Sequence, residues 1–138
     1  MTKYWINVIS KEHVLRGVKD GITQSGHGKE APLRKMKKGD WIIFYSPKQS
    51  LEGNEKLQAF TAIGQLPDDI IYQYEISVTF KPFRRKVDFT KAKEVSILPL
   101  IEQLEFIKNK KHWGFMFTFG LFGISKKDFN YISKQMLE

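Results

Sequence analysis

One apolar run most constrains the fold of this chain. Residues 41–46 have the sequence W-I-I-F-Y-S and follow Gly39-Asp40, a strong turn signal. Successive side chains of a strand point to opposite faces of its sheet, so a strand that is apolar at nearly every position is covered on both faces. We therefore predict that residues 41–46 form a central strand with packed layers on both sides.

Other strand and helix patterns surround this run without a regular βαβ alternation. Strands or extended segments are predicted at residues 3–8, 57–65, 70–80, 113–119 and 121–124. Helices are predicted after Ser10, at residues 31–38, at residues 94–107 and after the capping pair Ser125 and Asp128. This order predicts one α+β domain over residues 1–138, built around a bent sheet or a small β-barrel of five to six strands with short flanking helices.

A glycine-rich polar loop follows the first predicted helix. Residues 21–29 have the sequence G-I-T-Q-S-G-H-G-K, and aromatic strand segments lie on either side of them. Three glycines leave main-chain N–H groups open to a ligand, while the other residues add uncharged donors and acceptors and one lysine. The loop is suited to form one polar wall of a pocket that holds a flat, partly polar ring.

The charge distribution points to an anionic partner. The chain has a net charge of +8, of which residues 1–50 contribute +6, from ten Lys and Arg against four Asp and Glu. Aromatic residues make up 14% of the chain and are interleaved with these basic residues. Aromatic stacking contributes about 1–3 kcal/mol per base and cations bind phosphates, so the combination favours nucleic-acid or nucleotide binding. The alternative is that the lysines serve solubility alone.

Several catalytic and cofactor-binding arrangements are not supported by the spacing of residues. In a phosphate-binding P-loop that begins at Gly21, the residue directly after Gly26 must be Lys. His27 occupies that position, and Lys29 comes two residues too late. No pair of histidines has metal-ligand spacing, and Ser25 and His27 lie too close along one loop for a nucleophile and its base. We therefore expect no metal, no cofactor and no catalytic activity.

The cysteine count and the termini bear on the compartment. The chain has no cysteine, which excludes disulfides and thiolate chemistry and fits a reducing compartment. Its N-terminus has no signal-peptide pattern, and no apolar run approaches the length of a membrane span. We expect a cytoplasmic protein without a membrane partner.

Long segments of the chain resemble the prokaryotic EVE domain family. They are Tyr4–Gly17, Gly21–Lys29, Leu33–Pro47, Phe80–Phe89 and His112–Ser125, in one order over nearly the whole length. The resemblance implies a PUA-like fold related to the YTH proteins that bind methylated adenine. It also implies a non-catalytic protein that flips a modified base of RNA or DNA into an aromatic pocket, 5-substituted cytosine being one of the proposed ligands.

The resemblance also implies which residues form the site. The ligand-binding residues would be Trp5, Asn7, Val8, Ser10, Thr23, Gln24, Ser25, His27, Tyr45 and Ser46. Phosphate contacts would come from Lys29, Arg34, Arg84 and Arg85, and Asp40 is assigned to the turn before the central strand.

Two other functions and several details remain open at this point. The chain could be an enzyme that uses His27 as an acid–base on a nucleotide-like small molecule, or a module whose basic face binds an acidic protein. The sequence does not decide between RNA and DNA, between base modifications, or between a monomer and a weak dimer.

Overall fold

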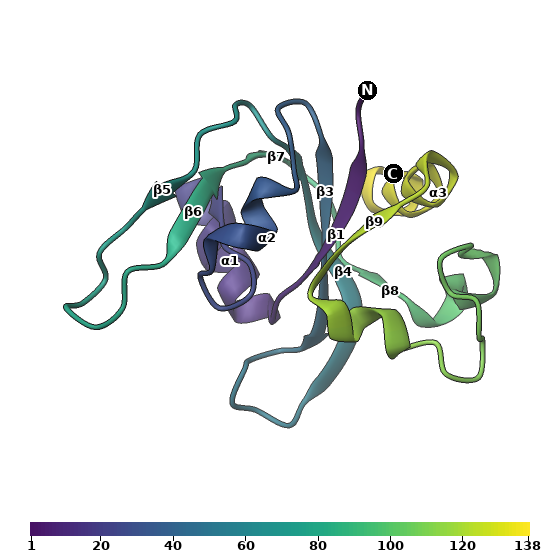
Figure 1. Cartoon of the computed structure of the whole chain (residues 1–138). Helices are drawn as coiled ribbons and strands as arrows, with labels where there is room; N and C mark the ends of the chain where they lie inside the picture. Colours follow the sequence, from purple (N-terminus) through teal and green to yellow (C-terminus); the bar gives the residue numbers. More distant parts are fainter.

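The computed structural model describes residues 1–138 and has a bent six-stranded sheet at its centre (Figure 1). The strand order across the sheet is β7-β4-β3-β1-β9, and β8 also pairs with β4. The strands are β1 (Tyr4–Val8), β3 (Trp41–Lys48), β4 (Lys56–Gln65), β7 (Asp88–Thr90), β8 (Val95–Ser96) and β9 (Leu121–Ile124). The predicted central strand is confirmed, because β3 lies in the middle of this order.

The sheet is bent and does not close. Only β1 and β3 run parallel, and the other pairs are antiparallel. The register between β3 and β4 shifts between Phe44 and Tyr45 and again between Ser46 and Lys48. Such irregularities bend a strand and increase its twist. The predicted α+β class with a bent sheet is confirmed, in its open form rather than as a closed barrel.

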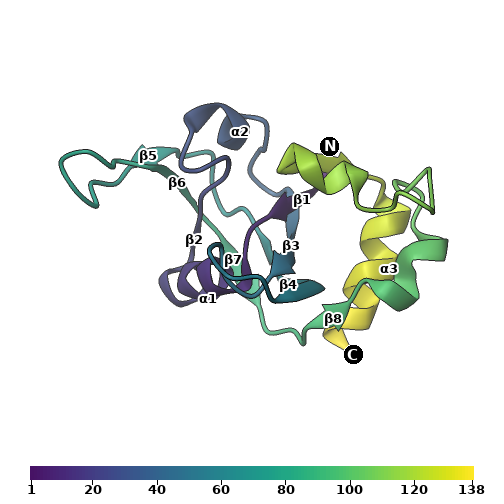
Figure 2. The ribbon, with the colours of Figure 1, turned by 90° about the horizontal axis from the view of Figure 1, so that it is seen from below.

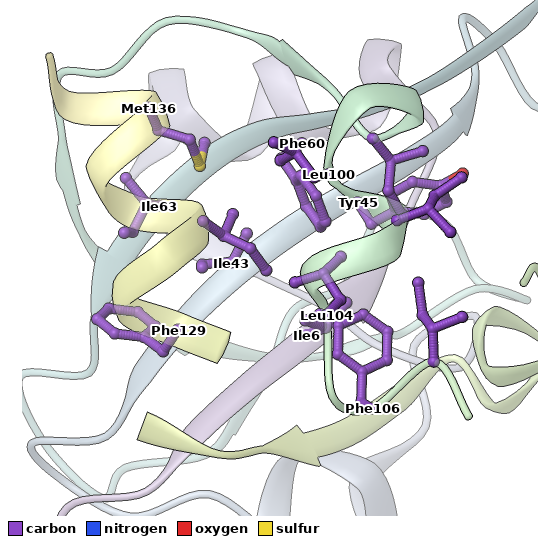
Figure 3. Packing of buried hydrophobic residues seen from close by; sticks show 14 of the residues in the cluster. Ile6, Ile43, Tyr45, Phe60, Ile63, Leu100, Leu104, Phe106, Phe129 and Met136 are labelled. Atoms are coloured by element: carbon purple, nitrogen blue, oxygen red, sulfur yellow. The ribbon is translucent and has the colours of Figure 1, made fainter. Parts of the chain in front are cut away.

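One face of the sheet carries what we call the α3-side core. Side chains of β3 and β4, including Ile43 and Ile63, pack there against helix α3 (Lys126–Leu137) and the 3₁₀ helix η1 (Leu98–Gln103), as Figure 3 shows. The helix α3 begins as predicted, because the Ser125 side chain accepts a hydrogen bond from the Asp128 N–H. It presents Phe129, Ile132 and Met136 to the sheet.

The opposite face carries the α1-side core. Helices α1 (Lys11–Asp20) and α2 (Glu30–Arg34) cover it, and Val14, Leu33 and the following Met36 pack against Phe44. Figures 1 and 2 show these two helices on the side of the sheet opposite to α3. The residues of β3 alternate between the two cores, which explains why every position from 42 to 45 is apolar.

A second, three-stranded sheet lies beside α1 and α2. Its order is β2-β6-β5, with β2 (Ile22–Thr23), β6 (Phe83–Lys86) and β5 (Tyr72–Gln73). The hairpin formed by β5 and β6 stands away from the rest of the molecule in both views (Figures 1 and 2).

Three predicted elements differ from the structure. The strand predicted at residues 70–80 is wrong: only Tyr72 and Gln73 pair as a strand, and the alternating Ile76, Val78 and Phe80 face solvent. The helix predicted at residues 94–107 is reduced to η1, whose period of three residues fits the three-residue spacing of the buried Ile101 and Leu104.

The third difference lies between two glycines. Residues 113–119 contain no strand, and the 3₁₀ helix η2 (Phe115–Phe119) lies between Gly114 and Gly120. None of the helices has the length and apolar composition that crossing a membrane requires.

Candidate functional site

A buried polar cluster joins β1 to the glycine-rich loop. The Asn7 side-chain amide donates to Thr23 Oγ1 at 3.2 Å and to the Gln24 carbonyl oxygen at 2.9 Å. Ser25 Oγ donates in turn to Asn7 Oδ1 at 3.1 Å. We call Asn7, Thr23, Gln24 and Ser25 the Asn7 cluster. Asn7, Thr23 and Ser25 are buried, so these hydrogen bonds fix the loop against the sheet at one position.

The loop beyond this cluster turns sharply and leaves donors unused. Gly26, His27 and Gly28 all have positive φ, at 55°, 62° and 87°. The N–H groups of Gly28 and Lys29 both donate to the Ser25 carbonyl oxygen. The N–H groups of Gln24, Ser25 and Gly26 donate to no acceptor within the protein, so this turn presents several free donors on one short segment.

Ser10 adds an unused hydroxyl at the end of the same strand. It lies between β1 and α1, is 7% exposed, and its Oγ has no hydrogen-bond partner. Ser46 is nearby, because its hydroxyl donates to the carbonyl oxygen of Ile9 at 2.7 Å, and it also bonds Thr61 Oγ1 at 2.8 Å. Ser46 is therefore satisfied within the protein, while Ser10 is not.

Two predicted ligand-binding residues lie on the wrong face of the sheet. Asn7 is aligned with Phe44, and Val8 is aligned with Tyr45, so Val8 and Tyr45 point to the face opposite to the Asn7 cluster. The Tyr45 ring stacks on Phe117 at 3.9 Å in the α3-side core. Burial raises the pKa of its hydroxyl well above the ordinary value. The structure does not bring Tyr45 or Val8 to the loop.

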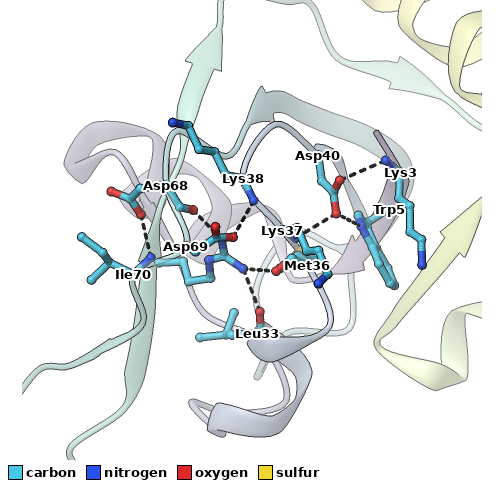
Figure 4. A network of polar contacts seen from close by, with 11 residues as sticks. Lys3, Trp5, Leu33, Met36, Lys37, Lys38, Asp40, Asp68, Asp69 and Ile70 are labelled. Carbon is cyan, nitrogen blue, oxygen red and sulfur yellow. Dashed lines mark hydrogen bonds and ion pairs between the residues drawn. The ribbon is translucent and has the colours of Figure 1, made fainter. Parts of the chain in front are cut away.

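Trp5 is on the same face as Asn7 but is held in the core. Its Nε1–H donates to Asp40 Oδ2 at 2.9 Å, and the ring is only 9% exposed (Figure 4). Asp40 also accepts from the main-chain N–H groups of Lys3 and Lys37, both at 2.9 Å, which bears out its structural assignment. The free edge of Trp5 lines an open depression of about 720 Å³ beside the N-terminal residues and Ile124, and no member of the Asn7 cluster lines it.

Arg85 is a structural residue rather than a phosphate ligand. Its side chain is 1% exposed and donates to the carbonyl oxygens of Leu33, Met36 and Asp68, with an ion pair to Asp69 at 3.7 Å. Desolvation by burial lowers its pKa, and nearby carboxylates counter this shift. The assignment of Arg85 to phosphate is therefore wrong, because its guanidinium joins α2 to the segment before β5 and does not reach solvent.

The other predicted phosphate ligands lie at or near the surface. Lys29 is exposed, Arg34 is exposed and pairs with Glu30 at 3.2 Å, and the half-buried Arg84 lies 4.2 Å from the centroid of the Tyr74 ring. Several exposed lysines outside the predicted set lie on the same elements or next to them. Lys35, Lys37 and Lys38 form the K-M-K-K run, and Lys81 and Lys86 lie at the two ends of residues 81–86.

His27 has no carboxylate partner, and the His, Asp and Glu side chains form no group that could hold a metal ion. The imidazole of His27 is exposed and makes no hydrogen bond to a carboxylate. No three His, Asp or Glu side chains are grouped so that they would hold a metal ion.

The β5–β6 hairpin is a further neighbour of the loop, one that no pattern in the sequence predicts. The Phe83 N–H donates to the Gly28 carbonyl oxygen at 2.9 Å. A Cβ atom on Gly28 would lie 2.5 Å from Pro82 Cβ and 3.6 Å from the Phe80 ring. The close approach of the two segments therefore depends on glycine at position 28.

A family model described as the EVE domain matches residues 3–135. The chain belongs to the EVE domain family. It is 52% identical to a UPF0310 protein of Mycolicibacterium gilvum over 96% of this chain and 94% of that protein. It is also 44% identical to the UPF0310 protein YdcG of Bacillus subtilis over 98% of this chain and 92% of that protein.

Solved structures with low sequence identity share the fold of this EVE domain. The crystal structure of ASCH from Zymomonas mobilis has a TM-score of 0.59 at 9% identity and covers 99% of this chain and 97% of that one. A crystal structure of an Agrobacterium tumefaciens protein has a TM-score of 0.57 at 14% identity, over 96% and 92% of the two chains. The PUA-like fold implied by the resemblance is thereby confirmed.

Proposed function

We propose that this EVE domain binds nucleic acid carrying a modified base and does so without catalysis. The observation that carries the proposal is the contrast between the satisfied Asn7 cluster and the unused donors beside it. Buried polar groups in proteins are nearly always paired, so the unpartnered hydroxyl of Ser10 indicates a place where a bound molecule supplies the partner. The free N–H groups of Gln24, Ser25 and Gly26 lie on the loop that the same cluster holds.

Asn7 positions the loop in this proposal and does not contact the base. Both of its donor hydrogens and its amide oxygen are engaged within the protein, which leaves it little capacity for a ligand. The half-buried Gln24 side chain makes no hydrogen bond within the protein and lies next to the free N–H groups. Gln24 and Ser10 are therefore the side chains that we assign to the edge of the base.

Basic residues near the loop bind the phosphates in this proposal. Lys29 ends the loop, Arg34 lies on α2, and Arg84 lies on β6, which pairs with β2 at the start of the loop. Charge of this kind supports non-specific binding to a phosphate backbone, whereas the polar loop accounts for the choice of base.

The test is isothermal titration calorimetry with plain and modified nucleosides and with short oligonucleotides that carry the same bases. We expect Gln24→Ala and Ser10→Ala to weaken the binding of the preferred nucleoside about tenfold each, because each removes one hydrogen bond to the ligand. Gln103→Ala is the matched control, since Gln103 is an exposed glutamine on η1, across the sheet from the loop. Failure of every nucleoside and oligonucleotide to bind would overturn the proposal.

The absence of catalysis needs its own measurement. The bound nucleoside or oligonucleotide is recovered after long incubation and analysed by mass spectrometry, with His27→Ala beside the unaltered chain. We expect unchanged ligand in both samples. Conversion that depends on His27 would favour an enzyme instead.

A further inference from the structure

The β5–β6 hairpin carries an apolar tip that is largely exposed to solvent. Tyr74, Ile76, Val78 and Phe80 are all exposed, Ile76 at 52% and Val78 at 87%. Single exposed apolar residues are ordinary, but four on one short projecting segment form a patch that indicates an interaction surface. We call these four side chains the hairpin tip.

The hairpin tip is an ordered structure. The hydrogen bonds of the hairpin continue beyond the paired strands, from the Tyr74 N–H to the Pro82 carbonyl oxygen and from the Ile76 N–H to the Phe80 carbonyl oxygen. Ser77 closes the turn, because its Oγ accepts from the Phe80 N–H at 3.0 Å. The guanidinium of Arg84 lies over the Tyr74 ring and supports the base of the hairpin. The tip therefore stands out from the molecule as a preformed projection.

One residue of the hairpin tip, Phe80, lies beside the glycine-rich loop, because its ring is 3.6 Å from the position of a Cβ atom on Gly28. The hairpin is joined to the glycine-rich loop by the Phe83 N–H bond to Gly28 and by the packing of Pro82 against Gly28. The same loop carries the free N–H groups of Gln24 and Ser25. A base held at those groups would therefore lie on the same loop that Phe80 of the hairpin tip contacts.

The charges around the hairpin specify the chemistry of its partner. Lys29, Lys35, Lys38 and Lys86 are exposed, and none of them has a carboxylate partner. The nearby acids are engaged, Asp69 with Arg85 and Glu75 with Lys81. The hairpin is therefore an apolar projection beside a surface with unpaired cations, which is complementary to a chain of stacked bases with anionic phosphates.

We propose that the hairpin tip is a wedge that packs between the base at the site and its neighbour in the same nucleic-acid strand. Apolar side chains inserted between base steps hold the bases apart, and the contact replaces part of the stacking that is lost. The wedge would bind bases of any sequence, because its contacts are apolar. This inference rests on the proposed function, since it places the hairpin tip next to a bound base.

The test uses the double variant Ile76→Ser and Val78→Ser with a short single-stranded DNA in which 5-methylcytosine is followed by 2-aminopurine. The fluorescence of 2-aminopurine reports the loss of stacking of the neighbouring base. We expect the unaltered chain to change this fluorescence and the variant not to, with about tenfold weaker binding of the strand by the variant. Binding of the nucleoside 5-methylcytidine should be the same for both proteins. Leu98→Ser is the matched control, because Leu98 is an exposed apolar residue on η1 across the sheet.

The outcomes separate the wedge from the proposed base site. Equal strand affinity and equal fluorescence change in the variant and the unaltered chain would overturn the wedge, whatever the nucleoside does. Weaker strand binding by the variant without any nucleoside binding would support the wedge and count against the base site. A change of oligomeric state in sedimentation, with strand binding unaffected, would make the hairpin tip a contact between two copies of the chain and would also overturn the wedge.

Discussion

Asp40 shows how one carboxylate joins the N-terminal segment to the turn before β3. It lies at the entry to β3, is buried, and binds the N-terminal segment, the Trp5 ring and the segment after α2 through three hydrogen bonds of 2.9 Å. The indole that the sequence suggests as a stacking surface is thereby fixed in the core.

The variant Asp40→Ala should lower the free energy of unfolding by about 3 kcal/mol or more, because it leaves three donors without their acceptor. Urea denaturation followed by tryptophan fluorescence measures the change. Asp88→Ala is the control, since Asp88 is exposed on β7, and it should shift the stability by less than about 0.5 kcal/mol. Similar effects of the two variants would contradict the role assigned to Asp40.

Tyr45 gives the protein a specific sensitivity to alkaline pH. Burial raises the pKa of its hydroxyl in the folded state, whereas the unfolded chain ionises near the ordinary value of 10.0. Unfolding therefore releases a proton above about pH 10, and the stability from this group is complete below that pH and is lost as the pH rises. Between about pH 9 and pH 11 the free energy of unfolding of the unaltered chain should fall by about 1.4 kcal/mol more than that of the Tyr45→Phe variant. If urea denaturation at the two pH values gave the same loss of stability for the unaltered chain and for Tyr45→Phe, this account would be contradicted.

At the scale of elements, the loop contacts the hairpin through the pairing of β2 with β6 and again at Gly28. Gly28 and Gly39 both have positive φ, at 87° and 90°, but a Cβ atom at Gly28 would collide with Pro82, whereas nothing lies within 4 Å of one at Gly39. Alanine at either position would therefore have the same unfavourable backbone conformation, but only alanine at position 28 would also collide with a neighbouring residue.

The variants Gly28→Ala and Gly39→Ala separate these two costs. Each variant should have a free energy of unfolding about 1 kcal/mol lower, because alanine disfavours the left-handed conformation. Gly28→Ala should be destabilised by about 1–3 kcal/mol more, because its methyl group overpacks against Pro82. Urea denaturation gives the stabilities, and oligonucleotide binding shows whether the hairpin has moved. If Gly39→Ala were as destabilising as Gly28→Ala, the close approach at Pro82 would not be the cause.

Elements with a local signal could be predicted from the sequence. β3, β4 and α3 were found from apolar runs and caps, because these patterns arise within the element itself. The segment at residues 70–80 was misassigned because alternating apolar residues occur equally in a strand with one buried face and in a hairpin that exposes them. What differs is the presence of a packing partner, and that is a tertiary property.

The site was predicted in part for a similar reason. Asn7, Thr23, Gln24 and Ser25 were selected through the family resemblance, and the structure joins them by hydrogen bonds. The face on which Tyr45 lies depends on strand register, which the sequence does not specify, and a one-residue difference moves a side chain to the other core. Arg85 was misassigned because a run of three basic residues does not show which one points inward.

On the scale of the whole molecule, the net charge is not evenly spread along the chain. Residues 29–38 and 81–86 carry exposed lysines around α2 and the second sheet, and both segments are joined by the buried Arg85. Residues 92–138, which include α3, carry a net charge of only +2, because five acidic residues offset seven lysines. A nucleic-acid strand should therefore lie over the α2 side.

This asymmetry predicts which lysines set the salt dependence of binding. The double variant Lys35→Ala and Lys38→Ala should reduce the slope of log affinity against log salt concentration by about 0.7 for each phosphate of a single strand that is no longer neutralised. The control, Lys126→Ala with Lys134→Ala, removes the same charge from exposed positions on α3 and should leave the slope almost unchanged. Fluorescence anisotropy over a series of salt concentrations measures both. Equal reductions of the slope by the two double variants would mean that the salt dependence follows the net charge of the protein and not the position of the lysines.

The parallel pairing of β1 and β3 has a consequence for how such a protein can diverge. Two adjacent parallel strands require a long connection, and residues 9–40 provide it with α1, the loop and α2. Apart from Asn7, the Asn7 cluster and its free donors lie within this one uninterrupted insert. Every strand of the central sheet lies outside this insert, so we expect changes in its exposed loop to leave the pairings of that sheet intact.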